Sequence, residues 1–289
     1  MFTVLIGLLS AVFYAFHDLL AQRVSRLAGL IRVLCWVIPT GVVILVPTAL
    51  LVDGLPATGA QWRAVAYCAA AGAFYLATWF AILRALQVGD LSLVAPLASL
   101  EGFFIAVFAL LKGETFTSLM GLGIALAVLG GTLAAVQGRA RSAAGAGWAL
   151  LTGVLWATAI IFFDQAGELS WLSQAAWSRI TSLILFVPVA VWALARAQGP
   201  GQTRGPRNVL GRKGAAICVG AGVLEVLGLV AMTLAVKRGP LAVAGVTVSQ
   251  YATVAVILGL VLLKERPRPH QVAGVICTIA AVTILSVVG

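Results

Sequence analysis

Long apolar runs separated by short polar links make up almost the whole chain of 289 residues. A helix needs roughly 20 apolar residues to cross a bilayer, and ten runs approach or exceed that length. We predict membrane spans at residues 2–21, 33–52, 62–86, 91–111 and 118–136, and then at 147–164, 172–194, 213–236, 241–262 and 270–288. The runs are continuously apolar, unlike the alternating strands of a membrane β-barrel, which are about 10 residues long. The predicted fold class is an all-α polytopic membrane protein.

The stretch from Arg84 to Gly123 recurs later in the chain, which indicates an internal repeat. At an offset of 150 residues, matching pairs are Ala85 and Ala235, Gly89 and Gly239, Leu91 and Leu241, and Ser99 and Ser249. After one inserted residue, Glu114 matches Glu265 and Gly123 matches Gly274. We therefore expect five-helix repeats at 1–136 and 147–289, joined by a link at 137–146. Because each repeat has an odd number of spans, the two must cross the membrane in opposite senses.

Composition agrees with a membrane protein and weakens one alternative. Hydrophobic residues make up 62% of the chain and charged residues only 10%, whereas soluble domains carry about 25% charged residues. The formal net charge of +10 could suggest a nucleic-acid partner. However, the basic residues lie in short links between apolar runs, which is the pattern of cytoplasmic loops. We expect a lipid bilayer as the surroundings and no nucleic acid.

The distribution of Lys and Arg predicts the orientation in the inner membrane. Four basic residues lie in links on the face that carries both termini: Arg63, Lys112, Lys237 and Arg238. Fourteen lie in links on the opposite face: Arg23, Arg26, Arg32, Arg84, Arg139, Arg141, Arg196, Arg204, Arg207, Arg212, Lys213, Lys264, Arg266 and Arg268. Because basic links stay in the cytoplasm, both termini are predicted to lie outside.

Two carboxyl groups near mid-membrane are the leading candidates for function. Glu101 and Glu225 lie about halfway along the fourth and eighth predicted spans, and an ionisable residue at that depth is a functional hypothesis by default. In the repeat register Glu101 matches Tyr251, and Glu225 matches Tyr75. We expect the four side chains to face a common central cavity, where either acid could bind solute or exchange a proton. The alternative is a structural carboxyl bonded to a neighbouring helix.

Further polar residues lie within the predicted spans. Tyr14 and His17 or Asp18 share one face of the first helix, so they could line a pathway with His17 as proton acceptor, or they could form a polar helix end. Arg179 lies about seven residues into the seventh span. It could bind a carboxylate or phosphate, or it could extend to the lipid headgroups.

Other matched positions predict packing or solute contacts. Glu114 and Glu265 recur at the same link of each repeat, and we expect both to cap or neutralise nearby helix ends. Gly72 and Gly222 match across the repeat and predict close helix packing. Trp79 and Trp156 could stack on an organic solute, although aromatic residues in membrane spans also pack or face lipid.

The combined pattern resembles the drug/metabolite transporter superfamily, in particular proteins with two EamA-type repeats. The residues that carry the resemblance are the Gly89–Pro96–Glu114–Gly123 series with its echo Gly239–Glu265–Gly274, the pair Arg32 and Arg179, and the pair Tyr14 and Trp156. The resemblance covers nearly the whole chain and implies transport of amino acids, metabolites or drugs. One departure is the fourth helix of each repeat, where Gly102 and Ala252 stand in place of the usual proline.

These observations together favour a secondary transporter that exports a small organic metabolite such as an amino acid, with proton coupling left open. The chain has no P-loop, so ATP is not its direct energy source. An uncoupled facilitator or a multidrug exporter is the alternative. An intramembrane enzyme is less favoured, because the only two histidines, His17 and His270, form no HExxH motif. We expect neither a cofactor nor a metal site.

Overall fold

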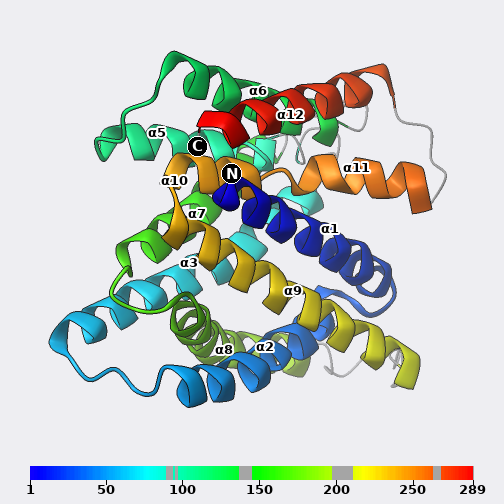
Figure 1. The fold of residues 1–289 in the computed structure, drawn as a ribbon. Coiled ribbons are helices and arrows are strands. Elements are labelled where there is room, and N and C mark those ends of the chain that lie inside the picture. The colour runs from blue at the N-terminus through cyan, green and yellow to red at the C-terminus, as the bar shows by residue number, and fades with distance from the viewer. Residues whose placement is uncertain (89–93, 95–96, 137–144, 197–210, 263–267, 289) are drawn as a thin grey trace.

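The computed structural model describes residues 1–88, 94, 97–136, 145–196, 211–262 and 268–288. Every regular element in these residues is a helix (Figure 1). The first half contains α1 (Phe2–Ala28), α2 (Leu30–Val52), α3 (Gly59–Val88), α5 (Glu101–Leu111) and α6 (Ser118–Ala135). The second half contains α7 (Ala146–Gln165), α8 (Trp171–Arg196), α9 (Arg212–Arg238), α10 (Leu241–Val248), α11 (Tyr251–Leu262) and α12 (Pro269–Val288).

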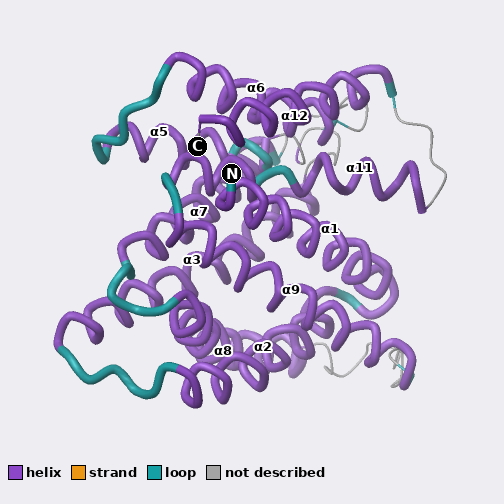
Figure 2. The backbone as a smooth tube through the Cα atoms, in the orientation of Figure 1, coloured by secondary structure: helices purple, strands orange, loops and turns teal. Residues whose placement is uncertain are grey.

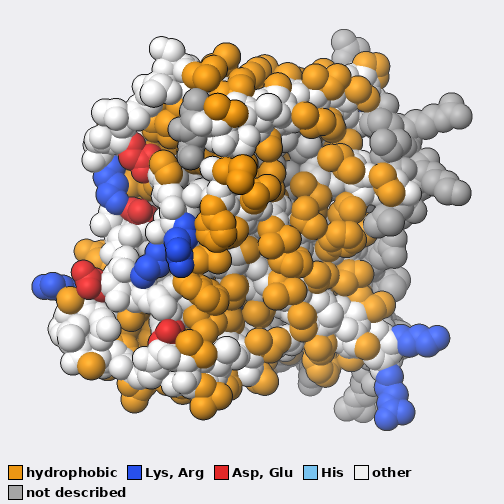
Figure 3. Space-filling model, in the orientation of Figure 1, with side chains coloured by type: hydrophobic (Ala, Val, Ile, Leu, Met, Phe, Trp, Pro, Cys, Tyr) orange, Lys and Arg blue, Asp and Glu red, His pale blue; other side chains and the backbone are white. Residues whose placement is uncertain are grey.

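The described helices fit a bilayer in length and polarity. Nine segments are long and apolar enough to cross a membrane, with residues 241–258 of α10 and α11 counted as one, and α5 is a shorter apolar helix. Figure 3 shows a broad apolar belt with charged side chains gathered toward its two ends. The predicted polytopic all-α fold is therefore confirmed.

Helix pairing follows the inverted repeat. The first helix of each repeat packs against the third helix of the other, as α1 against α9 and α3 against α7. The second helices, α2 and α8, pack together, and so do the fifth helices, α6 and α12. Figure 2 shows the α2–α8 and α6–α12 pairs on opposite sides of the bundle, with α1, α3, α7 and α9 between them. The interior between the repeats is thus built from the first, third and fourth spans of both halves.

Two of the predicted continuous helices are broken. Residues 99–100 form a turn, so Glu101 begins α5 instead of lying in mid-helix, and residues 249–250 form the equivalent turn between α10 and α11. In the second repeat the side chains account for the break without proline: Ser249 Oγ and Gln250 Nε2 both donate to the Val246 carbonyl oxygen, at 2.8 and 2.9 Å. Gln250 also donates to Ala127 of α6, at 3.1 Å. Broken helices in transporters commonly flank the solute site.

The first link is also shorter than predicted. We expected spans ending at residue 21 and restarting at 33, whereas only Gly29 separates α1 from α2. Its φ of 81° lies in the left-handed region that glycine adopts without strain. Arg23, Arg26 and Arg32 consequently belong to helices and not to a loop.

The membrane face with both chain ends, here called the terminal face, joins the two repeats through polar contacts. Lys112 pairs with Asp164, and Asp53 accepts hydrogen bonds from Ser170 and from Ser173, the latter at 2.7 Å. Glu114 accepts the backbone N–H groups of Leu241 and Ala242, at 2.8 and 3.3 Å. Each of these contacts links residues before position 137 with residues after it.

Candidate functional site

The first feature of the candidate site is a hydrogen bond between two residues that match in the repeat register. Tyr75 of α3 donates its hydroxyl to Glu225 Oε1 of α9 at 2.8 Å, and the two residues are 150 positions apart. Both side chains are buried, with exposed fractions of 5% and 0%. Residues related by a two-fold axis can touch only if the axis passes between them. Tyr75 and Glu225 therefore mark the axis that relates the repeats.

A second matched pair also lies on this axis. The rings of Tyr14 in α1 and Trp156 in α7 meet edge to face, with centroids 5.7 Å apart. The Tyr75 ring lies 5.2 Å from the Trp156 ring, so the aromatic pair adjoins the Tyr75–Glu225 pair. The Tyr14 hydroxyl and the Trp156 indole N–H are buried and have no hydrogen-bond partner among the described residues.

The third matched pair is Glu101 and Tyr251, which begin α5 and α11. Glu101 is 3% exposed, and its Oε1 atom has no hydrogen-bond partner in the described part of the chain. Tyr251 and Asp18 lie within Coulombic range of Glu101. The Trp156 indole also approaches Glu101, but its N–H does not meet hydrogen-bond geometry. This pair is close without being bonded, unlike Tyr75 and Glu225.

Arg179 adds a buried cation to the cluster. Its side chain extends from α8, is 1% exposed and forms an ion pair with Glu225. The guanidinium carbon also lies 4.2 Å from the centre of the Tyr75 ring, close enough for a cation–π contact. The alternative that Arg179 extends to the headgroups does not fit this burial. Its Nε and Nη1 atoms have no acceptor among the described residues.

His17 and Asp18 extend the cluster along α1. His17 Nδ1 lies 2.9 Å from the Ala221 carbonyl oxygen, which can only accept, so Nδ1 carries the hydrogen. Nε2 is buried without a partner among the described residues and lies 4.0 Å from Asp18, whose side chain is half-exposed. Trp79 packs near both His17 and Tyr75, at centroid distances of 6.0 and 6.4 Å.

The matched glycines permit close helix contacts around the cluster. A Cβ at Gly72 would overlap the Ser178 carbonyl group of α8. A Cβ at Gly222 would come within 2.8 Å of the Thr40 side chain in α2. Glu114 caps the N-terminus of α10 in the other repeat, a helix that packs against α5. Glu265, its counterpart, lies outside the described residues.

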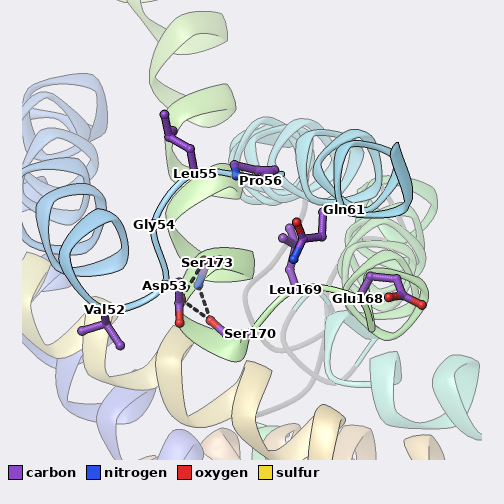
Figure 4. Close-up of a pocket in the computed structure, with 10 residues that line it drawn as sticks. All are labelled: Val52, Asp53, Gly54, Leu55, Pro56, Gln61, Glu168, Leu169, Ser170 and Ser173. Atoms are coloured by element: carbon purple, nitrogen blue, oxygen red, sulfur yellow. Dashed lines mark hydrogen bonds between the residues drawn. The ribbon is translucent and has the colours of Figure 1, made fainter. Parts of the chain in front are cut away.

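Two cavities open at the terminal face, away from the cluster. One of about 350 Å³ is lined by Asp53, Gln61, Glu168, Ser170 and Ser173 among others (Figure 4). A second, of about 270 Å³, lies between Asp164 and Lys237. Neither lining includes Glu101 or Glu225. The common cavity that we expected around the two acids therefore corresponds to neither, and the side chains of the cluster pack closely together.

The sequence analysis missed residues that shape the broken helices. Gln250 receives hydrogen bonds from Thr278 at 3.0 Å and from Thr253 at 3.4 Å in addition to those it donates. The available signal was the polar pair Ser249–Gln250 in an apolar run, immediately before Tyr251. The structural role of this pair depends on hydrogen-bond partners in α6 and α12, and no local sequence pattern predicts them.

Two inverted five-helix repeats with a buried polar cluster on their axis define a membrane transporter of the inverted-repeat class. Comparison with known proteins gives the family: the EamA-like transporter family matches residues 1–136 and 143–287, and the chain belongs to it. Among curated proteins, no relative matches the chain. A solved structure titled only "Crystal structure of protein" is similar in fold, with a TM-score of 0.76 and 14% identity over 99% of each chain.

Proposed function

We propose that the protein exports a small organic metabolite, such as an amino acid, across the inner membrane by alternating access between its two repeats. The observation that carries the proposal is the buried cluster on the two-fold axis. On both repeats it includes polar atoms with no hydrogen-bond partner among the described residues: Glu101 Oε1, Trp156 Nε1, Arg179 Nε and Glu225 Oε2. Buried polar atoms without partners are costly, and a solute that supplies those partners would bind where both repeats can reach it.

Glu101 is the proposed site of proton exchange. The described ion pairs do not include Glu101, so its carboxyl can bind either a proton or a cationic group of the solute. If the ammonium group of an amino acid displaces the proton, each bound solute releases a proton. Exchange of this kind would let a proton gradient drive export. Glu225 is the second candidate, but its Oε1 atom is engaged by Arg179 and Tyr75.

The polar contacts of the terminal face support a state that is closed on that side. Lys112–Asp164, Asp53 with Ser170 and Ser173, and Glu114 with the start of α10 all hold the repeats together. For the solute to leave through this face, these contacts must break. With the termini outside, as the charge distribution predicts, this is the state in which the outer exit is shut.

The transport experiment uses purified protein in liposomes and a screen of amino acids, nucleosides and cationic dyes. We expect counterflow of at least one amino acid and its accumulation against a gradient when a pH difference is imposed. Glu101→Gln should abolish pH-driven accumulation. Counterflow should persist with a lower apparent affinity, because the contact with the ammonium group is weakened. Glu168→Gln is the matched control, because Glu168 is exposed at the terminal face.

Two results would overturn parts of this proposal. Unchanged pH dependence in both Glu101→Gln and Glu225→Gln would exclude the two acids as coupling sites and leave His17 and Asp18 or an uncoupled facilitator. Counterflow confined to cationic dyes would favour multidrug export.

Orientation is tested separately in intact cells, with single cysteines in a cysteine-free background. Ala57→Cys lies in the exposed link between α2 and α3 and should react with a membrane-impermeant thiol reagent. Thr203→Cys, in the basic link outside the described residues, should be protected. The reverse labelling pattern would place the termini in the cytoplasm.

A further inference from the structure

The guanidinium group of Arg179 is used only in part by its surroundings. Nη2 bonds Glu225, while Nε and Nη1 have no acceptor among the described residues. A guanidinium has five N–H donors arranged as a planar fork. Arg179 is 1% exposed, so bulk water does not supply the missing acceptors. Arg179 is thus a buried cation at membrane depth, and most of its N–H groups have no acceptor among the described residues. This arrangement indicates a ligand that supplies acceptors and binds reversibly.

The groups around Arg179 lack acceptors as well. The Tyr14 hydroxyl is buried without a partner among the described residues, and it lies within Coulombic range of Arg179, Tyr75 and Glu225. Tyr75 is already committed to Glu225, and its ring covers one side of the guanidinium. Of the atoms on these four residues without a partner in the described part of the chain, Arg179 Nε and Nη1 only donate, the Tyr14 hydroxyl can donate or accept, and Glu225 Oε2 accepts. The unbonded N–H and O–H hydrogens therefore outnumber the unbonded acceptor atoms.

We infer that Arg179 and Tyr14 form a subsite for a carboxylate group of the transported solute. A planar carboxylate can accept two parallel N–H bonds from one edge of a guanidinium group, here from Nε or Nη1 together with the second hydrogen of Nη2. Its remaining lone pairs can accept the Tyr14 hydroxyl. This inference rests on the proposed function, because it assigns part of the solute that the site would transport.

Charge favours a carboxylate over a phosphate in this subsite. Arg179 and Glu225 together are neutral, so a bound carboxylate leaves one net negative charge and a phosphate leaves nearly two. Excess charge is expensive at this depth, and an ammonium group on the same solute, placed toward Glu101, would balance a single negative charge. The subsite therefore selects solutes with one carboxylate, and best those that also carry an amine.

The experiment measures binding to the full chain in nanodiscs without any gradient, so it does not depend on transport or coupling. The probes are acetate, benzoate and a panel of amino acids with uncharged side chains, each compared with its carboxamide, together with phenyl phosphate. At least one carboxylate should bind about tenfold to hundredfold more tightly than its carboxamide, because a hydrogen bond to a charged group is lost in the amide. Phenyl phosphate should bind more weakly than benzoate.

The variants separate recognition from folding. Arg179→Gln alone leaves Glu225 unpaired and can fail to fold. The informative variant is therefore Arg179→Gln/Glu225→Gln, which removes both charges and leaves two amides that can bond each other. Its thermal unfolding should be cooperative, and its preference for carboxylate over carboxamide should disappear. Arg179→Lys keeps the charge without the fork and should keep only part of the preference. Arg238→Gln, an exposed basic residue at the terminal face, is the control and should behave as the wild type.

The outcomes distinguish this inference from the proposed function. If amino acids are transported but every carboxylate binds with the same affinity as its carboxamide, the proposed transport function stands and the carboxylate subsite is overturned. A preference that persists in the folded double variant would overturn the role of Arg179. Carboxylate binding without transport of any amino acid would retain the subsite and contradict the proposed function.

Discussion

The two acid–phenol pairs on the axis occupy equivalent positions of the repeats, yet their bonding differs. Tyr75 and Glu225 share a 2.8 Å hydrogen bond, and Arg179 neutralises the carboxylate. Glu101 and Tyr251 lie near each other with no hydrogen bond between them, and Glu101 Oε1 is unpaired among the described residues. One copy of the motif is thus a bonded ion pair, whereas the carboxyl group of the other has no ion-pair partner among the described residues.

The difference arises from Arg179, which has no arginine at the equivalent place in the first repeat. Arg32 is the third residue of α2 and is exposed, whereas Arg179 is the ninth residue of α8. Arg179 is buried against Gly41 of α2 and reaches Glu225 on α9. An inverted repeat can therefore share one backbone plan while its two halves take separate tasks. The tasks that we propose are anion recognition beside Glu225 and proton exchange at Glu101.

The largest expected effect comes from breaking the bonded pair. Arg179→Leu leaves the Glu225 carboxylate buried without its cation, and we expect a loss of about 3–5 kcal/mol in the free energy of unfolding. The measurement is equilibrium unfolding in SDS titrations. Arg179→Leu/Glu225→Leu should recover most of this loss, because no uncompensated charge remains. A single variant as stable as the wild type would show that the pair is not ionised.

The next effect tests the two phenols. Tyr75→Phe removes a hydrogen bond to a charged group and should cost about 1.5–3 kcal/mol. Tyr251→Phe should cost much less, since its hydroxyl has no hydrogen bond to Glu101. Equal losses, measured by the same titration, would mean that both pairs are bonded in the membrane and that the contrast between them is wrong.

The smallest effect concerns the two matched glycines that lie about one helical turn before Tyr75 and before Glu225. Gly72→Ala would press against a backbone carbonyl group of α8, which cannot rotate away, and overpacking typically costs about 1–3 kcal/mol. Gly222→Ala would meet the Thr40 side chain, which can shift. Alanine also gains up to about 1 kcal/mol in helix propensity, so Gly222→Ala should be close to neutral. A reversed order of stability would contradict the tighter contact at Gly72.

Much of the fold could be predicted from the sequence. Hydropathy indicates where the chain crosses the membrane, and the 150-residue register indicates the repeat. The broken fourth spans were not predicted. In the second repeat no proline lies within the span, and the Val246 carbonyl is instead diverted by Ser249 and Gln250. The register also brought Glu225 and Tyr75 together as candidates. Tyr75 and Glu225 bond to each other because the two-fold axis between the repeats passes between them. The position of this axis cannot be predicted from the sequence.

The Tyr75–Glu225 bond has a consequence for how such a molecule could be assembled. Two separate copies of one five-helix chain, paired about a two-fold axis, would place identical side chains on both sides of that axis. Two carboxylates in contact repel, and two phenols leave no acid beside Arg179. Joining the halves in one polypeptide frees the two positions to differ, so an acid can meet a phenol there. In a single chain every molecule contains the acid–phenol pair. A mixture of two different five-helix subunits would also form dimers of identical subunits, which lack this pair.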